Sequence, residues 1–270
     1  ADGGMALLTA KTASALLDTV VNNEGLIQAR MIASEGGVIK LLGGTDGGTV
    51  AVGGTLDASA PGGGDGGSVE TSGYRVLVDP GAQVKAGAPS GEPGEWLLAG
   101  SGDIVIGDGL LPGDASSFVP ASVAANYLDA EWNMTIENLP APGQERDISV
   151  EAGLTWTSDH ALTLRADRDV VVNAAIDAEG AAPLTLRADW DADGEGTVIL
   201  NSEISSTGRV VIFYNPEGDV AAKYSGANRS DRGGNPYAAG VSGSLTAYML
   251  VNDLDDLNAV RTNLQGFYAL

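Results

Sequence analysis

The sequence contains no cysteine and a single histidine, and aromatic residues make up only 5 % of its 270 positions. Without cysteine, disulfide bonds cannot stabilise the fold, so stability has to come from the packing of the chain itself. The scarcity of aromatic residues favours a narrow core of small and aliphatic side chains, and the 39 glycines suit a chain with many tight corners. A chain of this length can bury one sizeable core and does not require two globular domains.

Basic residues are also scarce, because 14 Lys and Arg stand against 36 Asp and Glu, a formal net charge of −22 with a pI near 4.1. Such a chain repels phosphate backbones and anionic lipid headgroups, so nucleic acid and a bare membrane surface are poor partners. No stretch approaches the ~20 apolar residues that a membrane span requires. The first residues lack the basic leader and cleavage site of a signal peptide, so we expect a segment of a longer exported protein.

An internal repeat organises the chain. The hexapeptide LTLRAD occurs at residues 162–167 and again, 22 positions later, at 184–189. VVVNAAIDAEG (170–180) follows the first copy and VILNSEISSTG (198–208) the second, so that Asn173 corresponds to Asn201 and Ile176 to Ile204. A period near 22 with two short apolar runs is too short for a pair of helices and suits one coil of a β-solenoid. The sequence therefore predicts an all-β fold, a parallel β-helix.

A third copy of the motif at residues 48–59 fixes the expected inward face. Strands have a side-chain period of two, and matching positions of successive coils stack on one another. The residues predicted to point into the solenoid are Val50, Val52, Leu56, Val172, Ile176, Leu200 and Ile204.

The pattern divides the chain into three parts. We expect the β-helix over residues 1–214, interrupted by an excursion over about 107–133 that leaves the solenoid and contains a short helix opened by Pro120 and Ser122. Residues 6–17 fit either a helix or a solenoid edge. Residues 215–243 carry few apolar side chains and predict a loop or tether. Residues 244–270 predict a helix-strand appendage, with Asn252 as the helix cap and Leu250, Leu254, Leu257, Val260 and Leu264 at helical spacing.

Catalytic patterns are weak. A nucleophile-base pair would have to use His160, but its neighbours Ser158 and Asp159 are turn formers and indicate a coil corner. Asp167, Arg168 and Asp169 form the best candidate carboxylate cluster for polysaccharide cleavage. Asp189 repeats Asp167 in the next coil, however, which is typical of a solvated coil edge. The glycine run at 61–67 lacks the Gly-Lys-Ser/Thr ending of a phosphate loop and predicts a coil corner.

The sharper polar signal is DWDADGEG at residues 189–196, where the second repeat is longer than the first. Carboxylates at positions 1, 3 and 5 with glycine at position 6 match the first half of a calcium loop. The predicted metal ligands are Asp189, Asp191, Asp193 and Glu195, the last through its backbone carbonyl, and no other cofactor is expected. Position 12 is Leu200 instead of Glu, so a structural Ca²⁺ would bind weakly, with a Kd of about 10⁻⁴–10⁻³ M. The alternative is an acidic solvated loop.

The order of several motifs resembles a known family. VNNEGLIQA (21–29), GTV (48–50) with TLDAS (55–59), GSVETSG (67–73) and EWLL (95–98) are similar to the filamentous-haemagglutinin-like exoproteins of two-partner secretion. LTW (154–156), LTLRAD (162–167) and VNAAI (172–176) resemble the stretch after the secretion domain of that family. The similarity covers roughly residues 20–214, and the closing residues 248–270 look like a recurring element of the same exoproteins.

The resemblance implies a right-handed parallel β-helix, export through a partner transporter in the outer membrane, and a role at the bacterial surface or outside the cell, commonly adhesion to a protein or glycan on a host or neighbouring cell. The sequence departs from the family because it lacks the amino-terminal cap and the Asn-rich motifs of the early secretion domain. Two functions follow as expectations. The first is a non-catalytic adhesin segment, and the alternative is a β-helical polysaccharide lyase or hydrolase that uses surface Asp residues.

Overall fold

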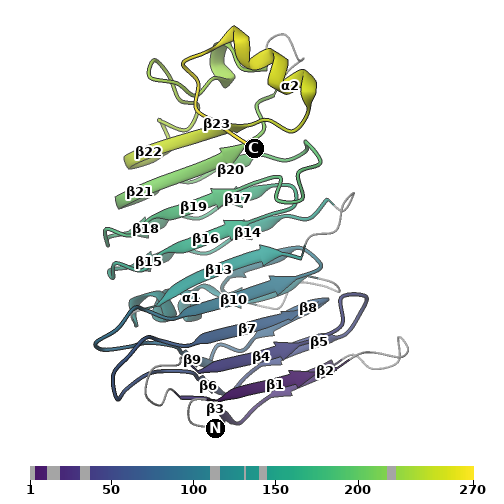
Figure 1. The fold of residues 1–270 in the computed structure, drawn as a ribbon, viewed down its shortest axis with the longest axis vertical. Coiled ribbons are helices and arrows are strands. Elements are labelled where there is room, and N and C mark those ends of the chain that lie inside the picture. The colour runs from purple at the N-terminus through teal and green to yellow at the C-terminus, as the bar shows by residue number, and fades with distance from the viewer. Residues whose placement is uncertain are drawn as a thin grey trace.

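The computed structural model describes residues 4–10, 19–30, 37–109, 116–130, 132–139, 145–217 and 223–270. The chain winds into a stack of coils whose named strands all pair in parallel with the coils above and below (Figure 1). This parallel β-helix confirms the predicted fold. The amino-terminal coils lie at one end of the stack and the helix near the carboxyl terminus lies at the other.

The stack has three faces. The first face is a sheet with the order β1 (Met5–Thr9), β4 (Val38–Leu42), β7 (Ser68–Gly73), β10 (Glu95–Gly100), β13 (Asn133–Asn138), β16 (Leu162–Arg165), β19 (Leu184–Arg187) and β21 (Ile204–Tyr214). The second has the order β2 (Thr19–Asn23), β5 (Thr49–Val52), β8 (Arg75–Val78), β12 (Ser117–Pro120), β11 (Ile104–Gly107), β14 (Ile148–Val150), β17 (Val170–Val172) and β20 (Val198–Leu200).

The third face is discontinuous. Its lower part is the three-stranded sheet β3 (Leu26–Gln28), β6 (Thr55–Asp57) and β9 (Gln83–Lys85). Its upper part consists of β15 (Leu154–Trp156), which pairs with β18 (Ile176–Ala178), and β18 pairs in turn with the first residues of β21. The 11-residue strand β21 joins this face to the first one, since its later residues pair with β19.

The register of the twin repeats is the predicted one. Leu162 pairs with Leu184, Val170 with Val198 and Ile176 with Ile204. Of the residues predicted to point inward, six are buried and Leu200 is partly buried against the core. Like residues therefore stack on like residues along each face, which extends one hydrophobic core through the stack.

Strand β1 corrects one of the two readings of residues 6–17. Residues 6–9 belong to β1, so a helix starting at residue 6 is wrong there. Residues 11–17 of that stretch lie outside the described residues.

The helical interruption falls where it was predicted, but it stays within the stack. Strand β12 is inserted between β8 and β11, and α1 (Ala121–Asp129) follows it, preceded by Pro120 at the cap position. Helix α1 packs against β9 and β15 and so takes the place of a third-face strand. Its inward side is part of the core through Ala121, Val123, Ala124, Tyr127 and Leu128. Helix α1 and strand β12 therefore belong to the stack, whereas residues 110–115 of the predicted excursion lie outside the described residues.

The carboxyl-terminal residues extend the first face. Strand β22 (Val241–Leu250) pairs with β21, and β23 (Tyr268–Ala269) pairs with β22. Helix α2 (Leu254–Ala259) and the 3₁₀ turn η2 (Val260–Thr262) lie between them. The cap of α2 is Asp253, whose side chain accepts a hydrogen bond from the Asp256 amide, and not Asn252 as predicted. Among the described residues, no helix has the length and hydropathy to cross a membrane.

Two features of this end were not foreseen. The loop that contains the turn η1 (Gly226–Asn228) is anchored by Tyr224 and Tyr237, which are 0 % and 9 % exposed. The apolar residues at helical spacing do not form one packed face, because Leu250 is buried whereas Leu254, Leu257 and Leu264 are exposed.

Candidate functional sites: an acidic loop and an aromatic groove

The structure brings three of the predicted metal ligands together in the acidic loop (residues 189–196). Carboxylate oxygens of Asp189, Asp191 and Asp193 lie within 4.8 Å of one another. Asp189 is fully buried and Asp193 is exposed. The exposed carboxylate of Glu195 is not part of this cluster. The tip of the loop projects outward at Ala192 and Asp193, as expected of residues added at a coil corner.

The backbone of the loop is shaped for this convergence. Asp189 and Ala192 have positive φ angles of 51° and 60°, and Gly194 has a φ of 94°. Oδ1 of Asp189 accepts a hydrogen bond from the Gly194 amide at 3.1 Å, and Oδ1 of Asp193 accepts one from the Glu195 amide at 2.9 Å. These bonds turn the chain back on itself, so that the side chains at positions 1, 3 and 5 face one another.

The loop rests on a column of buried polar side chains at one corner of the solenoid. Asn138, Asp167, Asp189 and Asn215 occupy this corner in successive coils and are at most 8 % exposed. The amide of Asp167 donates to Oδ1 of Asn138 at 3.1 Å, and Nδ2 of Asn215 donates to Oδ2 of Asp189 at 2.8 Å. The interpretation of Asp167 and Asp189 as a solvated coil edge is therefore wrong, since both are interior residues.

Burial concentrates negative charge beneath the loop. Nη2 of Arg146 lies 2.7 Å from Oδ2 of Asp167. Burial nevertheless raises the pKa of Asp167 to about 7; Arg146 opposes this rise, whereas Asp191 and Asp193 add to it. Burial also raises the pKa of Asp191, and the neighbouring Asp193 and Asp189 raise it further. The charge of this corner is thus incompletely neutralised by the described residues.

The remaining catalytic candidates serve the scaffold. Nδ1 of His160 lies 3.0 Å from the carbonyl oxygen of Leu128, at the end of α1, and 2.6 Å from Oγ of Ser158. Oγ of Ser158 donates to the same carbonyl at 2.6 Å. His160 and Ser158 therefore fasten a coil corner to α1, and a coil corner is the position that the sequence predicted for His160.

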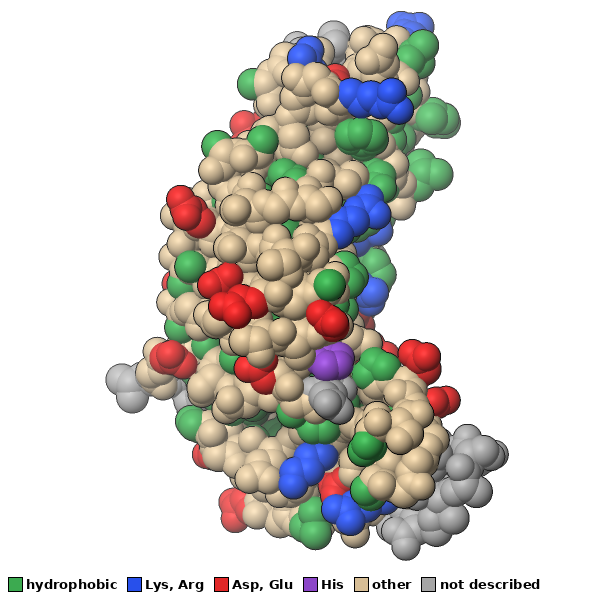
Figure 2. Space-filling model, turned by 90° about the vertical axis from the view of Figure 1, so that its left-hand side faces the viewer, with side chains coloured by type: hydrophobic (Ala, Val, Ile, Leu, Met, Phe, Trp, Pro, Cys, Tyr) green, Lys and Arg blue, Asp and Glu red, His purple; other side chains and the backbone are tan. Residues whose placement is uncertain are grey.

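The charged cluster at 167–169 is likewise engaged between coils. Arg168 contacts the carboxylates of Asp147 and Glu145 at 2.7–2.8 Å, and Oδ1 of Asp169 accepts a hydrogen bond from the Thr197 amide at 2.7 Å. Acidic side chains on the face shown in Figure 2 are spread along the stack rather than gathered in one cleft. The carboxylates at 167–169 therefore form contacts between coils and do not flank an open cleft.

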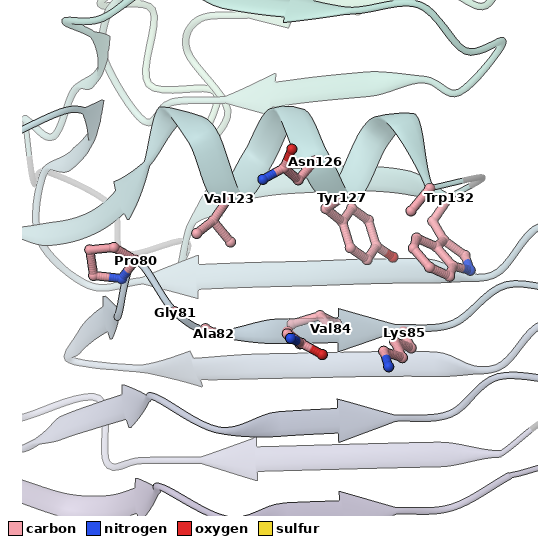
Figure 3. Close-up of a pocket in the computed structure, with 11 residues that line it drawn as sticks. Pro80, Gly81, Ala82, Val84, Lys85, Val123, Asn126, Tyr127 and Trp132 are labelled. Carbon is pink, nitrogen blue, oxygen red and sulfur yellow. The ribbon is translucent and has the colours of Figure 1, made fainter.

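Sequence reasoning missed a groove between α1 and β9 (Figure 3). Its volume of about 420 Å³ is within the range of about 300–1,000 Å³ typical of small-molecule sites. We call it the aromatic groove; its lining residues are Pro80, Gly81, Ala82, Gln83, Val84, Lys85, Val123, Asn126, Tyr127, Ala130 and Trp132. The groove exists because β9 is the edge strand of its sheet, and a helix rather than a further strand lies over it.

Aromatic contacts set the inner wall of the groove. Tyr127 is 3 % exposed, stacks on Trp132 with ring centroids 5.3 Å apart, and meets the edge of Trp96 at 5.1 Å. Burial, with a contribution from Glu95, raises the pKa of Tyr127. The Tyr127 hydroxyl and the Trp132 indole N–H are buried without a hydrogen-bond partner among the described residues. Pro120 and Ser122 signalled α1 in the sequence, but nothing there signalled a groove beside it.

No protein-family model, curated protein or solved structure matches the chain. The fold and the two sites therefore carry the functional argument.

Proposed function

We propose that the chain is a non-catalytic segment of a large bacterial exoprotein of two-partner secretion, in which it acts as a β-helical stalk and interaction surface. The full-length protein would be secreted or displayed at the cell surface after export through a partner transporter in the outer membrane. Its ligand would be a protein or glycan on a host or neighbouring cell. This proposal rests on the motif resemblance together with the parallel β-helix.

One observation carries the stalk role: some partly exposed charged side chains on the first face are paired from coil to coil. Lys40 and Glu70 lie 2.6 Å apart across β4 and β7, and Arg165 and Glu137 lie 3.0 Å apart across β16 and β13. A polysaccharide-cleaving enzyme needs two carboxyl groups on either side of an open substrate site. The ion pairs between Lys40 and Glu70 and between Arg165 and Glu137 instead link neighbouring coils, which suits a long support.

The aromatic groove is one contact surface that such a stalk offers. Polar side chains of Gln83, Lys85 and Asn126 line it together with the apolar wall formed by Val84 and Tyr127. A mixture of apolar surface and a few polar groups is typical of a site that fixes the orientation of its ligand.

Cell binding and polysaccharide cleavage distinguish the proposal from its alternative. The purified chain should bind the surface of target cells, and replacing Asn126 and Lys85 with Ala should weaken binding at least tenfold. Replacing the exposed Leu254 with Ala is the matched control and should leave binding unchanged. Incubation with acidic and neutral polysaccharides should give no shortened products. Products that disappear in Asp169→Asn would overturn the proposal in favour of a lyase or hydrolase.

A further inference from the structure

We propose that the acidic loop binds one Ca²⁺ ion, and that this ion fastens the loop to the carboxyl-terminal element formed by β22 and α2. The site would be held by the carboxylates of Asp189, Asp191 and Asp193. The inference does not depend on the proposed adhesive role, since it concerns the stability of the stack.

The arrangement of the carboxylates fits a single ion. Ca²⁺ binds oxygen ligands at about 2.3–2.6 Å, so two oxygens on the same ion are at most about 5 Å apart. The oxygens of the three Asp residues are all within 4.8 Å of one another. Ionised carboxylates at this separation repel one another, and a shared cation converts the repulsion into attraction.

The burial of carboxylate oxygens in and beneath the loop is a second observation that favours a bound cation. Both carboxylate oxygens of Asp191 are shielded from solvent, and neither accepts a hydrogen bond from a described side chain. Beneath the loop, the side chain of Asp167 is fully buried, and its Oδ1 also lacks a donor among the described residues. Burying a carboxylate away from water costs several kcal/mol unless hydrogen bonds or an opposite charge compensate for it. A cation bound by Asp191 supplies that compensation.

A chain of hydrogen bonds connects the proposed site to α2. Asp189 accepts from Nδ2 of Asn215 at 2.8 Å, and Oδ1 of Asn215 accepts from Nδ2 of Asn252 at 2.7 Å. The backbone amide of Asn252 donates in turn to Oδ2 of Asp256, within α2, at 3.1 Å. An ion that fixes the Asp189 carboxylate therefore also fixes Asn215 and Asn252.

The chemistry favours Ca²⁺ over Mg²⁺. Mg²⁺ demands near-ideal octahedral geometry, whereas Ca²⁺ accepts irregular sets of six to eight oxygens, including water and backbone carbonyls. Leu200 stands where a closing Glu would complete a calcium loop, so the Kd should fall in the range of about 10⁻⁴–10⁻³ M.

The binding test uses the full chain and two matched double variants. Asp191→Asn with Asp193→Asn removes two loop charges and keeps the side-chain shape. Asp46→Asn with Asp108→Asn removes two charges from exposed residues that form no side-chain hydrogen bond or ion pair in the described structure. At a Ca²⁺ concentration ten times the Kd, the unfolding equilibrium constant of the wild type and of the control should fall roughly tenfold. The loop variant should not respond.

Two further readouts make the result decisive. Tb³⁺ should show luminescence sensitised by Trp190, within the loop, in the wild type and control but not in the loop variant. Without Ca²⁺, the loop variant should be at least as stable as the wild type, because it relieves carboxylate repulsion. An equal response to Ca²⁺ in all three proteins, or an equal response to Mg²⁺ at matched ionic strength, would mean general screening of a −22 chain and would overturn the site.

The fastening role is tested separately. Ca²⁺ should slow hydrogen exchange of the α2 amides in the wild type. Asn252→Ala should retain Tb³⁺ binding but lose this protection. If Ca²⁺ protects α2 equally in Asn252→Ala, the link through Asn215 and Asn252 is wrong although the ion site stands.

Discussion

Arg30 holds the carboxylate of Asp57 from the neighbouring coil, with its Nε 2.7 Å from Oδ2 of Asp57. Gln28 and Ser59 also donate to this carboxylate, at 3.2 Å and 2.6 Å. Burial alone would raise the pKa of Asp57, but the hydrogen bonds from Arg30, Ser59 and Gln28 outweigh it and lower the pKa to about 2. The buried charge is thus stabilised by contacts within and between coils.

The lowered pKa of Asp57 predicts that the folded state loses stability at acidic pH. The folded pKa of Asp57 is below its ordinary value of 3.8, so its stabilisation is present above pH 4 and is lost as the pH falls through 2. At about 1.4 kcal/mol per pKa unit, the contribution is about 2 kcal/mol. Denaturant unfolding of Asp57→Asn should show about this loss at pH 7, with a shallower decline between pH 4 and 2. An acid limb identical to that of the wild type would contradict the assignment.

The register of the upper coils predicts unequal effects of two isoleucines. Ile204 is fully buried between Ile176 and Val241, whereas Ile199 on β20 is 36 % exposed. Ile204→Asp places an unpaired carboxylate in the core and should cost at least about 3 kcal/mol, while Ile199→Asp should cost less than about 1 kcal/mol. Thermal and urea unfolding of both variants measure the difference. Equal melting temperatures would rule out the register.

Two buried tyrosines predict opposite effects of losing a hydroxyl. Tyr224 donates to the Leu250 carbonyl at 2.7 Å, whereas the Tyr127 hydroxyl has no partner among the described residues. Tyr224→Phe should cost about 1 kcal/mol, because it leaves a buried carbonyl without its donor. Tyr127→Phe should be neutral or stabilising. A larger loss for Tyr127→Phe in chemical unfolding would reveal a hydrogen bond inside the aromatic groove.

The loop before β22 should be the first site of tryptic cleavage. Arg229 and Arg232 are exposed there, and few apolar contacts offset the entropy of ordering the loop. Cleavage after Arg232 leaves 232 of the 270 residues, a fragment of about 24 kDa from a 27.3 kDa chain. Tyr237→Ala should accelerate the cut by releasing one anchor. Mass spectrometry of the fragments identifies the first cleavage site. A first cut within residues 170–208 would contradict this prediction.

Much of the fold could be predicted from the sequence, because the repeated motifs indicate which residues of successive coils pair with one another. Asn173 and Asn201, matched by the repeat, are joined by a side-chain hydrogen bond of 2.7 Å. The position of β12 could not be predicted in this way. Its insertion between β8 and β11 reverses the order of two strands in space, and hydrophobic periodicity reports which residues face inward but not which neighbour a strand selects.

The candidate sites were predictable to different degrees. The spacing of Asp189, Asp191 and Asp193 reflects a local loop conformation, so the motif alone predicted their convergence. The burial of Asp167 and Asp189 was missed, because a repeated Asp looks the same in sequence whether water or Asn215 surrounds it. The aromatic groove depends on contacts between β9 and α1, which are about 40 residues apart in the sequence.

The replacement of a third-face strand by α1 also has a mechanical meaning. Neighbouring strands are about 4.8 Å apart and joined by a ladder of backbone hydrogen bonds, whereas a helix about 10 Å wide lies between β9 and β15 without such a ladder. Under tension along the stack, one of the three faces at this level resists with packing contacts and a few hydrogen bonds to Leu128 and Asp129 instead of a continuous ladder. Force spectroscopy of the chain held at its two ends should show rupture beginning at α1. The β-helix would then lengthen by yielding at a defined joint, and its outermost coils would remain folded under load.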